Sequence, residues 1–241
     1  MSGVTRTVFY RELGAAVLSR SRYLAFAAFF AISGALFCSA LQLGEGKFWT
    51  IQALWTLSVA LPLPIIASLI TMPLFAGERA AGTFEPLALL PIPLRKVVVG
   101  KFLASYLSVC LAIAGMLVPW LTLSQILKGR APAPGTLAAP LVILALHAFS
   151  WTALGTLSTA LARRPWIAAV GTILSGSALV LIWGAVSLFW LSGNWLSNAF
   201  PVLAELLDAA GGHVSLHSIV FHLAFGILCL FSASQALEAG R

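Results

Sequence analysis

Six apolar stretches, each bounded by charged residues, Gly or Pro, constrain the fold of this chain more than any other feature. They cover residues 23–43, 50–75, 98–127, 137–161, 166–191 and 216–237. A helix needs about 20 mostly apolar residues to cross the hydrocarbon core of a bilayer, and each stretch reaches that length. Because lipid cannot satisfy free backbone polar groups, such stretches form helices. The sequence therefore predicts an all-α membrane protein with six transmembrane helices in a single domain, residues 1–241.

The composition agrees with an integral membrane protein. Of the 241 residues, 60% are hydrophobic and 9% are charged, whereas a soluble domain has about 25% charged residues. The six spans leave no room for a nucleotide-binding domain. The spacing of Gly77 and Gly82 mimics a phosphate-binding loop, but the Lys that must follow is missing and no strand precedes it. The chain is therefore not expected to be an enzyme by itself.

The basic residues predict the orientation in the membrane. An even number of spans places both termini on one side. All of the 14 Lys and Arg residues except Lys47, Lys128 and Arg130 fall on that side. By the positive-inside rule, both termini are cytoplasmic. The net charge of +7 is thus an orientation signal, and no nucleic-acid partner is expected.

Two shorter helices and one kink are expected besides the spans. Residues 4–19 place apolar side chains largely on one helical face, which is typical of a helix lying along the membrane interface. Residues 197–208 resemble a short amphipathic helix on the outer side, ended by Gly211 and Gly212 and placed before span six. Two prolines are expected to kink the second span; they are Pro62 and Pro64.

A charged segment separates the second and third spans. Residues 75–101 read F-A-G-E-R-A-A-G-T-F-E-P-L-A-L-L-P-I-P-L-R-K-V-V-V-G-K. Gly77 is expected to let the chain turn as it leaves the second span. Glu78 and Arg79 are expected to hold the turn in water.

A short helix is predicted over residues 84–90 of this segment. Thr83 is a candidate N-cap, because its hydroxyl can accept a hydrogen bond from a free backbone N–H. Glu85 suits the positive end of the helix dipole. Pro91 ends the helix, since the residue before a proline disfavours the helical conformation. The segment therefore predicts a short cytoplasmic helix between spans two and three.

This segment resembles the loop between the second and third spans of ABC transporter type-2 permeases, especially their gliding-motility-like and copper-maturation-like branch. The shared pattern is a Glu with a basic residue, Gly-Thr-x-Glu, a leucine-rich turn, a Pro and a final Gly-Lys. The matching positions are Glu78, Arg79, Gly82, Thr83, Glu85, Leu87, Leu89, Leu90, Pro91, Gly100 and Lys101. The six spans and the interfacial first helix resemble the same family.

The resemblance implies a permease subunit of an ATP-driven transporter, with export favoured. Loop 77–96 would be the coupling helix that contacts a separate ABC ATPase subunit, in which ATP and magnesium bind. It would act through Glu78, Arg79, Gly82, Thr83, Glu85, Leu87 and Pro91. The other expected partners are a second permease subunit, as a homodimer or a related chain, a periplasmic accessory protein and the lipid of the bacterial cytoplasmic (inner) membrane. The sequence identifies no substrate and no substrate-binding residue.

Two alternative functions stay open. In the first, ATP hydrolysis drives a mechanical change in periplasmic partners without transport. The second is an ion-coupled carrier, which usually needs an ionisable group inside the membrane. All seven carboxylates lie outside the predicted span centres, so this alternative is disfavoured.

The histidines and cysteines predict neither catalysis nor metal binding. His147 and His222 lie within spans, where a neighbouring helix is expected to satisfy them. Ser150 near His147 is only weak evidence for an intramembrane enzyme. His213 and His217 lack a third ligand at close spacing, and the cysteines form no CxxC pair. No metal site is therefore expected.

Overall fold

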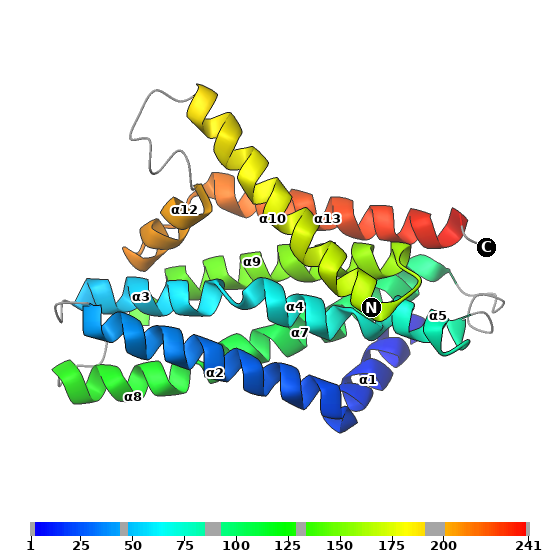
Figure 1. Cartoon of the computed structure of the whole chain (residues 1–241), viewed down its shortest axis with the longest axis horizontal. Helices are drawn as coiled ribbons and strands as arrows, with labels where there is room; N and C mark the ends of the chain where they lie inside the picture. Colours follow the sequence, from blue (N-terminus) through cyan, green and yellow to red (C-terminus); the bar gives the residue numbers. More distant parts are fainter. Residues whose placement is uncertain (1–2, 44–47, 85–92, 129–133, 191–200, 240–241) are drawn as a thin grey trace.

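The computed structural model describes residues 3–43, 48–84, 93–128, 134–190 and 201–239 (Figure 1). These residues form helices and turns, and none of them lies in a strand. Six helical segments among them are long and apolar enough to cross a membrane. The all-α class and the six transmembrane helices are therefore confirmed, and the chain is an integral membrane protein. The side of the membrane that each end faces stays a prediction.

The helices follow the six predicted spans and add shorter segments between them. In chain order they are α1 (Gly3–Leu18), α2 (Arg20–Leu43), α3 (Phe48–Ala60), α4 (Leu63–Thr71), the π-helix η1 (Pro73–Gly77), α5 (Glu78–Ala80), α7 (Leu94–Gly115), α8 (Leu117–Lys128), α9 (Pro134–Leu161), α10 (Pro165–Trp190), α12 (Pro201–Ala210) and α13 (Leu216–Ala239). Helix α1 occupies the place of the predicted interfacial helix. Helix α12 is the helix predicted before span six, although residues 191–200 lie outside the described part.

Prolines interrupt the second and third spans. Helix α3 ends at Ala60, Pro62 lies in the turn that follows, and α4 begins at Leu63, which confirms the expected kink. In the third span, Pro119 has no N–H for the carbonyl four residues earlier, and its ring crowds that carbonyl. Helix α7 accordingly ends at Gly115. The carbonyl of Met116, between α7 and α8, accepts a hydrogen bond from Trp55 Nε1 at 3.1 Å.

The expected turn at Gly77 is wrong. Helical backbone continues through η1 and α5 to Ala80, so the second spanning segment runs from Ile51 to Ala80. The chain turns at Gly82, whose φ is +70°. Glycine tolerates this left-handed conformation because it has no Cβ. Glu78 and Arg79 consequently lie on the last helical turn and not in a solvated loop.

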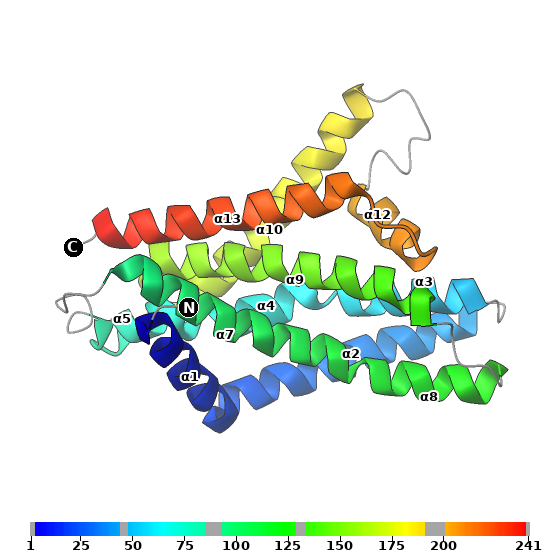
Figure 2. The same cartoon turned by 180° about the vertical axis from the view of Figure 1, so that it is seen from behind.

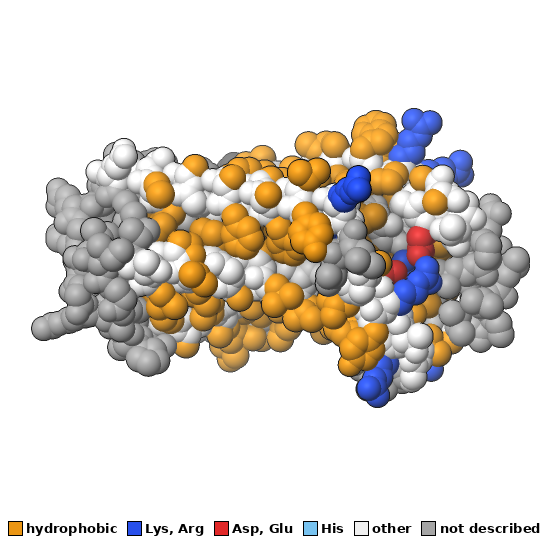
Figure 3. Space-filling model, turned by 90° about the horizontal axis from the view of Figure 1, so that it is seen from below, with side chains coloured by type: hydrophobic (Ala, Val, Ile, Leu, Met, Phe, Trp, Pro, Cys, Tyr) orange, Lys and Arg blue, Asp and Glu red, His pale blue; other side chains and the backbone are white. Residues whose placement is uncertain are grey.

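Three spanning segments form the inside of the bundle and three form its outside. The segments that contain α4, α7 and α9 bury more than half of their spanning residues, whereas α2, α10 and α13 bury less than a third. Helix α9 packs against α4, α7, α10 and α13. Figure 3 shows one face on which apolar side chains cover the middle and basic side chains gather toward one end. Such an apolar surface is suited to lipid.

The two ends of the bundle hold different elements. Figures 1 and 2 both show α1, α5 and the last turn of α13 toward one end, which we call the α5 end. Helix α12, the start of α3 and the last turns of α8 lie toward the other end, called the α12 end. Each end holds one group of buried polar side chains, and these two groups are the candidate sites.

Candidate functional site

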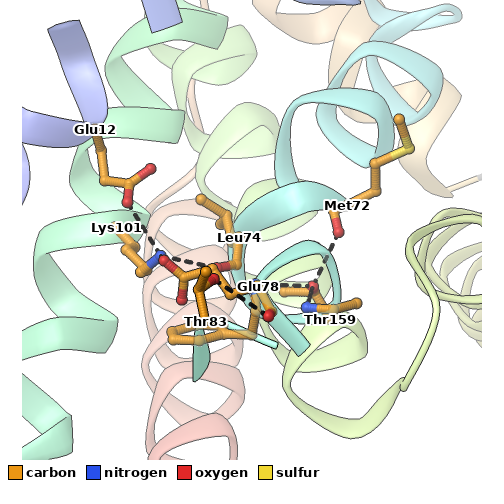
Figure 4. A network of polar contacts seen from close by, with 9 residues as sticks. Glu12, Met72, Leu74, Glu78, Thr83, Lys101 and Thr159 are labelled. Carbon is orange, nitrogen blue, oxygen red and sulfur yellow. Dashed lines mark hydrogen bonds and ion pairs between the residues drawn. The ribbon is translucent and has the colours of Figure 1, made fainter. Parts of the chain in front are cut away.

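A buried lysine joins three elements at the α5 end (Figure 4). Lys101 Nζ lies 2.7 Å from Glu78 Oε1 and 3.0 Å from Glu12 Oε1. It also donates a hydrogen bond of 2.8 Å to the carbonyl of Leu74. Lys101 is only 2% exposed. This group, which we call the Lys101 network, ties α1 and α7 to the π-helix η1 and to α5.

A threonine of α9 satisfies the backbone of the π-helix. The irregular winding of η1 and the missing N–H of Pro73 disturb the ordinary i→i−4 ladder. Thr159 Oγ1 accepts hydrogen bonds from the backbone N–H groups of Phe75, at 3.3 Å, and of Ala76, at 2.9 Å. The same hydroxyl lies 3.2 Å from the carbonyl of Met72, to which it donates. One side chain therefore fastens the end of the second span to α9 (Figure 4).

Arg79 connects the same segment to the last turn of α9. Its Nη1 donates hydrogen bonds to the carbonyls of Ala160, at 2.6 Å, and Ala162, at 3.1 Å. A cation at the C-terminus of a helix also suits the helix dipole. The guanidinium lies over the ring of Phe84, 4.9 Å from its centroid. Arg79 thus links α9 to the first residue of the predicted coupling helix.

Four of the predicted coupling residues are described, and they act partly inside the subunit. Glu78 and Arg79 make the contacts given above, and Gly82 forms the turn. The Thr83 hydroxyl lies 3.3 Å from the carbonyl of Glu78 and donates to it, while its capping partners would lie beyond residue 84. The remaining predicted residues, Glu85, Leu87 and Pro91, lie outside the described part of the chain. Contact with an ATPase stays a prediction for all seven.

A second polar group lies at the α12 end, and we call it the histidine–glutamate cluster: His147 of α9, Glu205 of α12 and His222 of α13. His147 Nε2 lies 3.9 Å from Glu205 Oε2, and His222 Nε2 lies 3.4 Å from Glu205 Oε1. The two imidazole rings are 4.4 Å apart between centroids. Both histidines are buried and Glu205 is largely so. One donor atom from each residue lies within 4.8 Å of the other two.

The facing atoms of the cluster have no hydrogen-bond partner among the described residues. These atoms are His147 Nε2, His222 Nε2 and Glu205 Oε1. An unsatisfied buried polar atom costs about 1–3 kcal/mol. Burial would raise the pKa of Glu205, but His222, His147 and Ser218 together lower it below its ordinary value.

The opposite ring nitrogens of the histidines are occupied. His147 Nδ1 lies 3.0 Å from the carbonyl of Ile143. Because a carbonyl only accepts, Nδ1 carries the proton, and Nε2 of the neutral ring keeps its lone pair. His222 Nδ1 lies 2.7 Å from Ser150 Oγ, which is also 3.4 Å from the carbonyl of His222. In the tautomer with the proton on Nδ1, this nitrogen donates to Ser150 Oγ, the hydroxyl donates to the His222 carbonyl, and the lone pair is on Nε2.

Close helix packing holds the cluster together. A Cβ atom at Gly226 would overlap the ring of Phe149, so only glycine lets α13 approach α9 at this level. His222 is one turn before Gly226, and His147 and Ser150 flank Phe149 along α9. Helix α12 packs against α3 and α9 through buried side chains that include Leu206 and Ala209. This contact directs Glu205 toward the two histidines.

Sequence reasoning missed this cluster. The expectation that carboxylates lie outside the span centres holds for the chain position of Glu205, which belongs to no spanning helix. Its carboxylate nevertheless contacts two span histidines. The sequence placed Ser150 near His147 as weak evidence for an enzyme, but in the structure the Ser150 side chain bonds to His222. One signal was available: Glu205 shares an i, i+3, i+4, i+7 face with Val202, Leu206 and Ala209, and a charge on such an apolar face needs a buried partner.

Comparisons with known proteins identify no family for this chain. No family model matches the chain, and no curated protein matches its sequence.

Proposed function

We propose that this protein is the membrane-spanning permease subunit of an ATP-driven ABC transporter of the bacterial cytoplasmic membrane, working as an exporter. Its separate ATPase subunit binds ATP and magnesium and docks on the segment between the second and third spans. A second permease subunit completes the translocation path. The sequence resemblance of residues 75–101 supports this proposal, and so do the six apolar spans.

The Lys101 network is the observation that carries the proposal. A docking segment transmits force only if it is tied to the helices that must move. Glu78 is bonded to Lys101 of α7, and Lys101 is bonded to Glu12 of α1. Arg79 and Thr159 tie the same segment to α9. A displacement of residues 78–84 therefore reaches α1, α7 and α9 through short, buried polar contacts.

The interrupted second span gives this displacement a direction. Helix α4 continues into η1 and α5 at one end and is separated from α3 by the turn at Pro62 at the other. A break in the helical hydrogen-bond ladder is a point at which a span can bend. We infer that docking moves α4, η1 and α5 as a unit that pivots near Pro62.

Copurification of an ATPase tests the proposal. The tagged chain is purified in mild detergent from membranes of its source organism, and vanadate-sensitive release of inorganic phosphate is measured. Mass spectrometry identifies the ATPase subunit. We expect hydrolysis to copurify with the wild type and to fall at least about tenfold, the equivalent of 1.4 kcal/mol of docking energy, in Glu85→Lys.

A matched substitution on the opposite side is the control. Glu45→Lys makes the same charge change in the loop between the first and second spans, on the predicted outer side, and should leave hydrolysis unchanged. Equal hydrolysis in Glu85→Lys and the wild type contradicts the docking assignment. A wild-type chain that brings no ATPase with it contradicts the proposed function. Periplasmic proteins that copurify without substrate-stimulated hydrolysis would favour the mechanical alternative.

One observation favours the ion-coupled carrier as the second candidate. Glu205 supplies an ionisable group beside two histidines of the bundle, and a buried ionisable group is what ion coupling requires. This alternative needs no ATPase. It predicts that a pH gradient alone drives transport in vesicles containing the purified chain, and that His147→Gln and His222→Gln remove this dependence.

A further inference from the structure

Three donor atoms of the histidine–glutamate cluster converge on one point from three different helices. His147 presents Nε2 with its lone pair free, because Nδ1 donates to the carbonyl of Ile143. His222 presents Nε2 while Nδ1 is held by Ser150. Glu205 presents a carboxylate oxygen. Metal-ligating histidines commonly bond their second nitrogen to a carbonyl or another polar group in this way.

The spacing of the donors suits a transition-metal ion. With metal–ligand distances of 2.0–2.1 Å, neighbouring ligand atoms of a tetrahedral zinc site are about 3.3 Å apart. His222 Nε2 and Glu205 Oε1 are 3.4 Å apart, and His147 Nε2 and Glu205 Oε2 are 3.9 Å apart. One donor atom from each residue lies within 4.8 Å of the other two, so the side chains must rotate inward to bring all three donors to bonding distance of one ion.

A hydrogen bond among the three residues satisfies the cluster less well than a cation does. A proton on His222 Nε2 can be shared with Glu205 Oε1, but at 3.4 Å this hydrogen bond is long and weak. A proton shared between His222 and Glu205 would also leave His147 Nε2 without a hydrogen-bond partner among the described residues. A single cation accepts electron pairs from both nitrogens and from the carboxylate, and it balances the charge of Glu205.

We propose that His147, Glu205 and His222 bind one divalent transition-metal ion, and that Zn²⁺ is the ion their chemistry fits best. Two imidazoles and one carboxylate form a recognised zinc donor set with a fourth position open to water or another ligand. Imidazole donors also suit copper, iron and nickel. Ca²⁺ and Mg²⁺ require six or more oxygen ligands or several retained waters, and three buried residues with two nitrogens do not provide them.

The bound ion joins α12 to the bundle. Glu205 is on α12, whereas the two histidines are on α9 and α13. Loading the ion fixes the short helix over the ends of these two spans, and removing the ion releases that link. The ion thereby controls how firmly α12 closes the α12 end. This inference does not depend on an ATPase partner, and binding is measured on the purified chain alone.

Zinc binding by the purified full-length chain is the test. The chain carries a tag without histidine, is depleted of metal with a chelator, and is titrated with Zn²⁺ against a chromophoric competitor. We expect one tightly bound Zn²⁺ ion per chain. Glu205→Gln, which preserves the size of the side chain, should weaken binding by more than the 10–100-fold typical of lost outer-shell contacts. His222→Gln should weaken Zn²⁺ binding to a similar extent, and it provides the test if Glu205→Gln does not fold.

The chain contains its own matched control. It has four histidines, and the other two are exposed: His213 lies in the turn between α12 and α13, and His217 lies in the first turn of α13. The double variant His213→Ala/His217→Ala should bind Zn²⁺ as the wild type does. Ser150→Ala should weaken binding by about 10–100-fold, because Ser150 orients His222 without touching the ion.

X-ray absorption at the zinc edge identifies the ligands independently. The proposal requires nitrogen and oxygen ligands at 2.0–2.1 Å and no sulfur at about 2.3 Å. Sulfur ligation would assign the ion to a cysteine and overturn the proposal. Unchanged binding in Glu205→Gln and His222→Gln overturns it, and so does a wild-type chain that binds no zinc at micromolar concentration. In the last case the cluster is a proton site, as the carrier alternative requires.

Discussion

The two polar groups at opposite ends of the bundle differ in whether a side-chain cation lies among them. In the Lys101 network, one cation faces two carboxylates and a carbonyl, all within 3.0 Å. In the histidine–glutamate cluster, the imidazole nitrogens lie 3.4 Å or more from the carboxylate oxygens, and His147 Nε2, His222 Nε2 and Glu205 Oε1 have no hydrogen-bond partner among the described residues. The cation of the first group is a side chain of the protein itself, although Glu78 Oε2 has no hydrogen-bond partner among the described residues. We infer that the second group is completed only when a cation is added.

This difference assigns different roles to groups of similar burial. A buried charge is tolerated when it is paired and hydrogen-bonded, so the Lys101 network is a permanent connection of η1 and α5 to the helices α1 and α7. Donors that face one another without partners carry a cost that a ligand can relieve. We infer that the α5 end holds a mechanical link and the α12 end holds a binding site.

The largest effect is expected from removing the cation of the Lys101 network. Lys101→Met removes the ammonium group from two largely buried carboxylates, Glu12 at 13% and Glu78 at 16% exposure. Breaking a buried ion pair in this way costs about 3–5 kcal/mol. We expect the free energy of unfolding to fall by this amount, measured by circular dichroism during denaturation in mixed micelles.

A compensating variant separates lost charge balance from lost packing. The triple variant Lys101→Met/Glu12→Gln/Glu78→Gln removes all three charges and should recover a large part of the stability, because no unpaired charge stays buried. If Lys101→Met is as stable as the wild type, the network is not a structural connection. The contrast with the α12 end then disappears.

The second-largest effect is expected at the α12 end, where Zn²⁺ binding to the histidine–glutamate cluster should stabilise the folded chain. A ligand that binds only the folded state at 100 times its dissociation constant stabilises that state by about 2.7 kcal/mol. Zn²⁺ at that excess should raise the free energy of unfolding of the wild type by this amount. Glu205→Gln should show no increase, whereas His213→Ala/His217→Ala should show the full increase. Equal stabilisation of Glu205→Gln and the wild type would mean that Zn²⁺ acts elsewhere.

The spanning helices could be predicted from sequence because apolar length alone determines them. Each of the six apolar stretches corresponds to a candidate span, and Pro62 and Pro64 indicated where the second span breaks. The end of that span could not be predicted, since the helical backbone continues beyond Phe75 into charged residues. It continues because Thr159 and Lys101 satisfy its polar groups, and both partners are distant in sequence.

The two candidate sites differ in how far the sequence indicated them. The segment around Glu78 stands out because its charges follow an apolar run, although its pairing with Glu12 and Lys101 has no local pattern. The histidine–glutamate cluster combines residues that no spacing rule connects. Each is unremarkable alone, and only the packing of α12 and α13 on α9 brings them together. The only local indication is that Glu205 lies on the apolar face of its helix.

The third effect is expected at the α5 end, where the neutral hydrogen bonds of Thr159 can be compared with the charged contacts of the Lys101 network. Thr159→Val keeps the shape of the side chain but leaves the N–H groups of Phe75 and Ala76 without their acceptor. The expected loss is about 1–3 kcal/mol in the free energy of unfolding, which is less than for Lys101→Met.

The matched control is Thr156→Val, one turn earlier on α9. The Thr156 hydroxyl bonds only the carbonyl of Thr152 within its own helix, so that change should cost less. Equal losses would show that Thr159 does not hold η1.

The smallest effect is expected from an exposed ion pair at the α5 end, and it isolates burial as the cause of the contrast. Arg95 Nε lies 3.3 Å from Glu238 Oε1, with side chains 58% and 37% exposed. Arg95→Met removes one cation at the same end of the bundle as Lys101→Met does. Water and salt screen the exposed pair, so the loss should be about 0–1 kcal/mol and should vanish at high ionic strength. A loss as large as that of Lys101→Met, unchanged by salt, would mean that net charge at this end governs stability. The burial of the Lys101 network would then not be the reason for its strength.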